Sequence, residues 1–115
     1  MGRWEGLTAD EINAREPEAF KEWMARVGDF PFPDGESVRD LLARTWPAFE
    51  KIVGAHAGER VAIVGHGGTN RVILCRALDL PLDRLLVFGQ DYAALSLLEG
   101  LTGRFVLHLL NQTIP

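Results

Sequence analysis

One glycine-rich loop contains the residue types that most directly suggest chemistry: Gly65–Gly68, which reads Gly-His-Gly-Gly. It follows the short apolar run Val61–Val64 and precedes a helical pattern. The first backbone N–H groups of a helix have no intrahelical acceptor, and the helix dipole favours negative charge at that end. Glycines let a ligand approach such a backbone closely, and His66 adds an imidazole side chain beside it. The loop therefore predicts a binding site for a phosphate group.

The same loop admits three other interpretations. A dinucleotide-binding fingerprint would need a third glycine at position 70, where the chain has Asn70. The oxyanion loop of an esterase would need a nucleophile elbow of the form Gly-x-Ser-x-Gly, and the best approach to it begins at Gly35 but has Arg39 in its last position. The third interpretation is a compact turn that binds nothing.

Length and composition describe an ordinary globular chain. With 115 residues, we expect a single domain over 1–115. Hydrophobic residues make up 47% and charged residues 24% of the chain, which argues against disorder. The formal net charge of -4 disfavours binding to a phosphate backbone, so no nucleic-acid partner is expected. No apolar run approaches the ~20 residues of a membrane-spanning helix, and the first residues lack a secretory signal, so no membrane partner is expected.

Cysteine and histidine usage narrows the chemistry further. The single cysteine, Cys75, cannot form an internal disulfide, which indicates a reducing cytoplasm, and its helical position predicts a small core residue. His56 is predicted to be solvated in a loop, and His108 to be structural within a strand. Histidines so dispersed lack the spacing of metal ligands, so neither a metal nor another cofactor is expected.

The elements that position the loop follow from periodicity and turn residues. Thr8 and Pro17 indicate two helix starts, and Ser37 is a credible N-cap for a third helix that Pro47 should kink or divide. Together the patterns predict an α/β layer structure. Its elements are helices from Ala9, over 17–27, over 37–55 and over 69–78, a loop over 28–35, a strand over 60–64, and a hairpin of 92–98 with 104–110 around a loop over 99–103.

Three motifs in a fixed order resemble one known family. They are Gly2–Thr8 (Gly-Arg-Trp-Glu-Gly-Leu-Thr), Pro33–Ser37 (Pro-Asp-Gly-Glu-Ser) followed by Arg44, and Val61–Gly68 followed by Arg71. The chain is similar to the histidine phosphatase superfamily, in its phosphoglycerate-mutase-like group. The nearest members are the bacterial small phosphatases, including α-ribazole phosphatase. This resemblance implies a partial three-layer phosphoglycerate-mutase-like fold with a mixed sheet, missing its N-terminal strand or strands.

The resemblance also implies a function and a set of site residues. The family transfers a phosphoryl group through a phosphohistidine, without a metal, and its phosphatases act on small phosphorylated metabolites. His66 matches the second histidine of the pocket, which holds the transferring phosphoryl group. Gly67 would donate its backbone N–H to a phosphoryl oxygen, and Arg71 would brace the phosphate from the following helix. Glu36 and Ser37 start a helix and are expected to face the substrate.

The chain departs from the family pattern in one respect. No Arg-His-Gly motif occurs in the 115 residues, so the nucleophile is absent, and with it the proton-donating glutamate and both pocket arginines. This indicates the C-terminal portion of a phosphatase from a truncated reading frame, inactive by itself. We expect it to associate with itself or with a missing N-terminal half. The alternatives are a phosphoglycerate-mutase-type phosphotransferase and a non-catalytic module that binds phosphate or dimerises.

Overall fold

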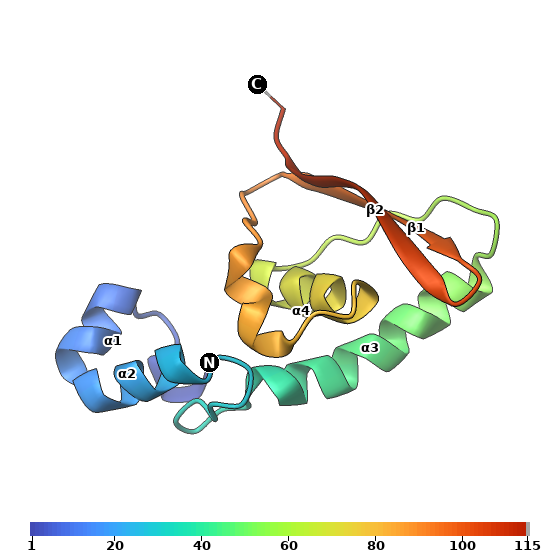
Figure 1. Ribbon diagram of the computed structural model, residues 1–115. Helices are drawn as coiled ribbons and strands as arrows, with labels where there is room; N and C mark the ends of the chain where they lie inside the picture. The colour runs from blue at the N-terminus through green and yellow to red at the C-terminus, as the bar shows by residue number, and fades with distance from the viewer. Residues whose placement is uncertain (115) are drawn as a thin grey trace.

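The computed structural model describes residues 1–114, which form two lobes connected by a long helix (Figure 1). The N-terminal lobe consists of the short 3-10 helix η1 (Gly2–Trp4), α1 (Ala9–Arg15) and α2 (Pro17–Ala25). The second lobe consists of α4 (Gly67–Ala77), the 3-10 helix η2 (Leu82–Val87), β1 (Leu95–Leu101) and β2 (Arg104–Gln112). The connecting helix is α3 (Val38–Ala55). The radius of gyration is 15.5 Å, against about 13 Å for a compact domain of this length, so the arrangement is open.

Local capping explains where the N-terminal helices begin. The Thr8 hydroxyl accepts a hydrogen bond from the Glu11 backbone N–H at 3.2 Å, and the Glu11 carboxylate accepts one from the Thr8 N–H at 3.3 Å. This reciprocal pair is a capping box. Pro17 occupies the first turn of α2. The backbone N–H groups of a first turn have no intrahelical acceptor, so proline, which lacks an N–H, loses no hydrogen bond there. Both helix starts confirm the sequence predictions.

Aromatic side chains build the core of the N-terminal lobe. Trp4, Ile12 and Phe30 are buried, and the Trp4 ring stacks on Phe30 with the two centroids 5.5 Å apart. The indole N–H of Trp4 donates to the Glu16 carboxylate at 2.6 Å, so the buried ring keeps its polar group satisfied. Trp4 therefore connects η1 to the junction of α1 and α2.

Helix α3 spans 18 residues and links the two lobes. Ser37 is its N-cap, because the Ser37 hydroxyl accepts the Asp40 N–H at 3.1 Å and the Asp40 carboxylate accepts the Ser37 N–H at 3.0 Å. The helix is continuous through Pro47, so it is not divided there. Phe49 is buried two residues later, and its packing supports the helix past the missing hydrogen bond. None of the described helices is both long and apolar enough to cross a membrane.

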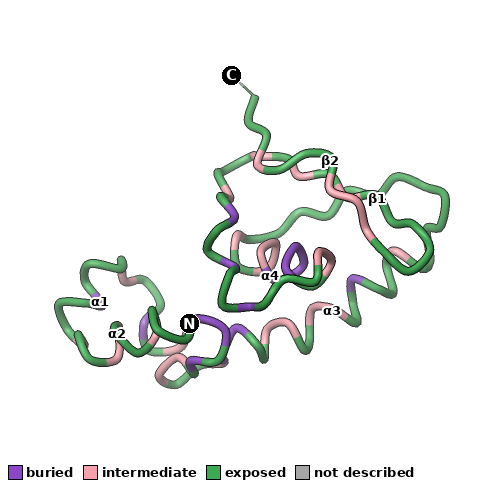
Figure 2. The backbone as a smooth tube through the Cα atoms, in the orientation of Figure 1, coloured by how far each residue is buried: buried purple, intermediate pink, exposed green. Residues whose placement is uncertain are grey.

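The second core lies around α4, as Figure 2 shows by the buried colouring of its backbone. Val72, Leu74 and Cys75 are buried there with residues from α3 and η2. Burial raises the pKa of the Cys75 thiol, since the charged thiolate loses its hydration. The prediction that Cys75 is a small core residue is confirmed.

The predicted hairpin is present with a shorter turn. Strands β1 and β2 pair antiparallel from Leu95 with Gln112 to Leu101 with Arg104. The ladder continues through Glu99 and Gly100, where the sequence predicts a loop, because Val106 and Phe105 lie opposite them. The turn is therefore Thr102-Gly103, and Gly103 supplies its positive φ of 75°.

Residues 60–66 are extended but form no strand, so the predicted strand at Arg60–Val64 is wrong for this structure. A strand exists through ladder hydrogen bonds to a neighbour, and no backbone hydrogen bond joins residues 60–65 to any other described segment. Val64 is 97% exposed, and Val61 and Ile63 are close to half exposed. The α/β class is confirmed, but the sheet that residues 1–114 form has two antiparallel strands and is not mixed.

Candidate functional site: the N-terminus of helix α4

Helix α4 begins at the loop in which the sequence predicts a phosphate site. His66 is the N-cap of α4, with extended backbone angles, and its carbonyl accepts the Asn70 backbone N–H at 2.9 Å. The imidazole makes no capping hydrogen bond and is exposed. A side chain at this position can therefore contact a ligand bound at the start of the helix.

The backbone of the first turn of α4 is open to an anion. The amides of Gly67 and Gly68 donate to no acceptor among residues 1–114. A Cβ built at Gly68 would meet only Leu41, at 3.9 Å, so side chains leave this backbone uncovered. Two amides with no protein acceptor, at the positive end of the helix dipole, favour a bound negative charge.

Arg71 folds back over the same turn. Its Nε donates to the Phe88 carbonyl at 2.8 Å, and a Cβ built at Gly67 would lie 3.3 Å from its Nη1. None of the ion pairs within residues 1–114 involves Arg71. The guanidinium therefore adds positive charge beside Gly67 that no carboxylate of the described chain neutralises.

Two polar residues near the site are not identified by the sequence argument. The same Cβ position at Gly67 lies 3.6 Å from Cβ of Gln90, and a Cβ at Gly65 would lie 3.0 Å from Oδ1 of Asn70. Asn70 enters the sequence argument only as a mismatch to the dinucleotide fingerprint. Gln90 follows Gly67 by more than twenty residues, and no local pattern marks it, so only tertiary structure brings it here.

Glu36 and Ser37 lie at the start of α3. The Ser37 side chain is buried in its capping box, and the Glu36 carboxylate pairs with Arg44 at 2.6 Å. The hydrogen bond from Arg44 lowers the pKa of Glu36. One turn after Ser37, Leu41 contacts the Gly68 position, so α3 begins close to the start of α4. A role for Glu36 and Ser37 toward a substrate stays a prediction.

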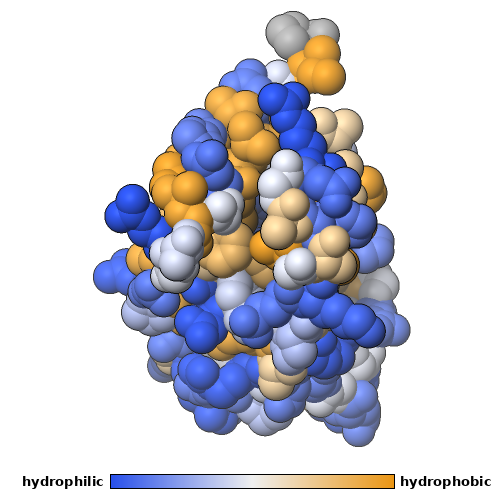
Figure 3. Space-filling view, turned by 90° about the vertical axis from the view of Figure 1, so that its right-hand side faces the viewer, coloured by the Kyte–Doolittle hydropathy of each residue, from blue (hydrophilic) through white to orange (hydrophobic). Residues whose placement is uncertain are grey.

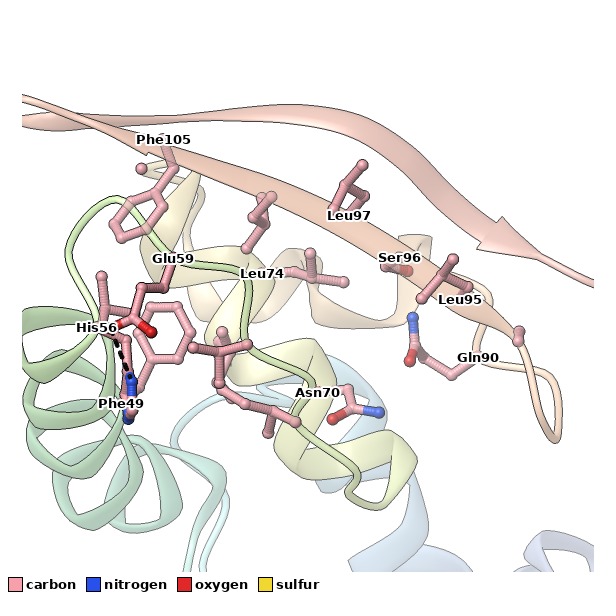
Figure 4. A pocket seen from close by; sticks show the side chains of 17 residues that line it. Phe49, His56, Glu59, Asn70, Leu74, Gln90, Leu95, Ser96, Leu97 and Phe105 are labelled. Atoms are coloured by element: carbon pink, nitrogen blue, oxygen red, sulfur yellow. Dashed lines mark ion pairs between the residues drawn. The ribbon is translucent and has the colours of Figure 1, made fainter.

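The other two histidines lie elsewhere. His56 is exposed at the end of α3, 3.5 Å from a Glu59 carboxylate oxygen. Figure 4 places this pair at one end of a cavity and Asn70 at the other end. His108 is exposed on β2, with its Nε2 3.0 Å from a Glu99 oxygen. Within residues 1–114 no group of three His, Cys, Asp or Glu side chains is placed to hold a metal ion.

The geometry is that of a helix N-terminus with open backbone amides beside an exposed histidine. The family model described as the histidine phosphatase superfamily (branch 1) matches residues 1–113, and the chain belongs to this superfamily. The resemblance found in the sequence is thereby confirmed.

Individual relatives agree with this assignment. Phosphoserine phosphatase 1 of Hydrogenobacter thermophilus is 29% identical over 112 residues, which are 97% of this chain and 53% of that protein. The structure of Bacillus stearothermophilus YhfR is 30% identical with a TM-score of 0.84, over 99% of this chain and 57% of the other. A mycobacterial glucosyl-3-phosphoglycerate phosphatase is 27% identical with a TM-score of 0.77, over 98% and 61%. The chain therefore spans somewhat more than half the length of these proteins.

Proposed function

We propose that this chain is the C-terminal portion of a cytoplasmic, metal-independent phosphomonoesterase that acts on a small phosphorylated metabolite. The observation that carries the proposal is the start of α4. There an exposed imidazole, two amides without an acceptor among residues 1–114 and an arginine without an acidic partner in that range lie within residues 66–71. The names of the phosphoserine and glucosyl-3-phosphoglycerate phosphatases support a phosphate monoester as the substrate class.

The proposed chemistry assigns His66 and the Gly67 amide to one task, which is holding the phosphoryl oxygens. Stabilising the charge of the transferring group supplies most of the catalysis in such reactions. In the intact enzyme, an imidazole nitrogen of a second histidine attacks phosphorus. The bond from phosphorus to the ester oxygen breaks, and an acid protonates the leaving alkoxide. Water then attacks the phosphohistidine and releases phosphate.

The isolated chain is proposed to be inactive, because no second histidine lies beside His66. His56 lies at the opposite end of the cavity from Asn70, and His108 pairs with Glu99 on the hairpin. The remaining function of the chain alone is weak anion binding. A hydrogen bond to a charged group contributes roughly 1.5–3 kcal/mol, and a helix terminus ~0.3–1 kcal/mol. Inorganic phosphate is therefore expected to bind with a Kd of about 1 mM, or about -4.1 kcal/mol.

The test is a phosphatase assay with 4-nitrophenyl phosphate and O-phosphoserine. The chain is assayed alone and after mixing with the part of Bacillus stearothermophilus YhfR that it does not match. The chain alone should release no phosphate, and the mixture should release it. His66→Gln should abolish the restored activity, whereas the matched control His56→Gln should leave it unchanged.

Three outcomes bear on the proposal. Restored turnover that depends on His66 supports it. If neither sample releases phosphate, but an NMR titration of the Gly67 amide shows that phosphate binds, the chain is a non-catalytic binding module instead. Transfer of phosphate between the hydroxyl groups of a phosphoglycerate, without release, indicates a mutase.

A further inference from the structure

Gln90 is a polar side chain that lies beside the start of α4 and has no role in the phosphate site described so far. Its Cβ lies 3.6 Å from the Cβ position of Gly67, whose backbone N–H has no acceptor among residues 1–114. The Gln90 side chain is half-buried, and its Nε2 donates to the carbonyl of the preceding residue, Gly89, at 2.8 Å. A carboxamide that is bonded to its own chain neighbour can turn to another acceptor by rotation within the side chain.

The Gln90 carboxamide is a polar group in a mostly apolar setting. It lines a cavity of about 270 Å³ beside β1, and most of the side chains that line this cavity are apolar. Figure 3 shows apolar side chains gathered on the upper half of one face, with a hollow between them. In Figure 4, Asn70 and Gln90 lie at the same end of the cavity, and His56 and Glu59 lie at the other. The end beside α4 is therefore a polar one, and a few polar groups in an apolar surface are what orients a bound ligand.

Two anchors hold the segment around Gln90 in this place. On one side, Nε of Arg71 donates to the Phe88 carbonyl at 2.8 Å. On the other side, the Asp91 backbone N–H donates to Oδ1 of Asn111 at 2.8 Å, and Nδ2 of Asn111 donates to the Asp91 carboxylate at 3.1 Å. Because the chain is held on both sides of Gln90, its backbone loses little further freedom when the side chain binds a ligand.

Asn111 has several features that suit it to this task. Its backbone adopts a left-handed conformation with a φ of 53°, which asparagine tolerates better than most residues. Its backbone N–H donates to the Ser96 hydroxyl at 3.1 Å, which fixes it against β1. A Cβ built at Gly89 would lie 2.8 Å from Nδ2 of Asn111, so the absence of a side chain at Gly89 lets the two segments approach closely. Both polar atoms of the Asn111 side chain thus serve the segment that contains Gln90.

We propose that Gln90 is a further phosphate-binding residue of this chain. Its Nε2 leaves the Gly89 carbonyl and donates to a phosphoryl oxygen held at the start of α4, and Asn111 is a positioning residue that acts through Gln90. The proposal rests on the proposed phosphate site at Gly67. A phosphoryl group presents more acceptor sites than the open amides of α4 can occupy, so a neighbouring neutral donor finds an acceptor there.

The test is a titration of the whole chain with inorganic phosphate, followed by NMR at the Gly67 amide. Gln90→Ala should raise the Kd about five- to tenfold, because a hydrogen bond to a charged group contributes more than the bond to Gly89 that it replaces. Gln90→Met keeps the length of the side chain but removes the donor, so it should raise the Kd to a similar extent.

Gln112→Ala is the matched control. Gln112 is exposed on β2, and its Nε2 likewise donates to the carbonyl of a chain neighbour, Thr113, at 3.2 Å. This variant removes the same side chain from a similar local arrangement, but none of the contacts around Gly67 involves it. It should bind phosphate with the Kd of the parent chain, within about twofold.

Asn111→Gly tests the positioning role. Glycine accepts the left-handed backbone, but both side-chain hydrogen bonds to Asp91 are lost, so the Kd should rise by no more than it does in Gln90→Ala. The double variant Gln90→Ala/Asn111→Gly should bind phosphate as well as Gln90→Ala does, because Asn111 acts through Gln90. Losses that add in the double variant overturn the positioning role. Thermal unfolding of each variant checks that it still folds.

The outcomes distinguish this proposal from the proposed function. A raised Kd in both Gln90 variants, with Gln112→Ala unchanged, supports Gln90 as a phosphate-binding residue. A parent-like Kd in either Gln90 variant, or an equal rise in Gln112→Ala, overturns this role and leaves the phosphate site at α4 standing. If the Gly67 amide of the parent chain shows no shift with phosphate, the site itself is wrong, and both proposals are overturned.

Discussion

The two glycines at the start of α4 give the sharpest test of the site geometry. Gly68→Ala and Gly67→Ala make the same chemical change at adjacent helical positions. A Cβ at Gly68 meets only Leu41, at the ordinary contact distance of 3.9 Å. A Cβ at Gly67 meets Nη1 of Arg71 at 3.3 Å, which is tighter than a normal contact. The two substitutions should therefore change the free energy of unfolding differently.

Helix propensity raises the free energy of unfolding of both variants by a similar amount. Replacing glycine by alanine in a helix adds roughly 0.5–1 kcal/mol to the free energy of unfolding, so Gly68→Ala should be stabilised by about that amount. In Gly67→Ala the guanidinium must move, and this weakens the 2.8 Å hydrogen bond from Nε to the Phe88 carbonyl. Such a bond to a charged group contributes roughly 1.5–3 kcal/mol, so even partial loss cancels the gain. We expect Gly68→Ala to be the more stable variant by about 1 kcal/mol.

The assay is urea unfolding of both variants, alone and combined with Arg71→Ala. Without the guanidinium, Gly67→Ala should recover its propensity gain, and the two alanine variants should agree within about 0.5 kcal/mol. The reasoning fails if the two variants are equally stable with Arg71 present. It also fails if their difference persists in the Arg71→Ala background.

Three further predictions concern the two cores. Hydrogen bonds from Arg3 and Trp4 lower the pKa of Glu16 in the folded chain. The contribution of Glu16 to the free energy of unfolding is therefore complete at a pH above the ordinary pKa of 4.5, and it is lost as the pH falls through the lowered pKa. The urea midpoint of Glu16→Gln should therefore fall less than that of the parent chain when the pH is lowered from about 5 to about 3. Trp4→Ala should lower the free energy of unfolding by about 3–5 kcal/mol, and Trp4→Phe by less, as measured by chemical denaturation. Cys75 should react with a thiol reagent at pH 8 only in denaturant, because burial both covers the thiol and raises its pKa; rapid labelling of the folded chain would contradict this.

Much of the fold could be predicted because its signals are local. Thr8, Pro17 and Ser37 mark helix starts through hydrogen bonds, or through a missing donor, within one turn of chain. The glycine loop is recognisable for the same reason, since the open amides and the His66 side chain belong to consecutive residues. Local rules fail where a second segment decides the outcome. Val61–Val64 has the composition of a strand, but composition supplies no hydrogen-bonding neighbour.

The surroundings of the site depend on contacts between distant segments. Gln90 reaches Gly67 because η2 packs against α4 and returns the chain to the start of that helix. Arg71 is predicted from its spacing, but its orientation is set by the Phe88 carbonyl, seventeen residues later. Periodicity and motif spacing contain no information on such pairs, because they describe only neighbours along the chain.

The amino-acid order by itself determined the family, the helix starts at Thr8, Pro17 and Ser37, and the histidine at the end of an apolar run, since each depends on residue types a few positions apart. Only the tertiary structure decided that this run has no ladder partner among residues 1–114, that Arg71 lies over Gly67, and that a cavity opens beside β1. The physical reason is that hydrogen-bond pairing and packing require two segments to lie side by side. Which segments do so depends on how the whole chain folds.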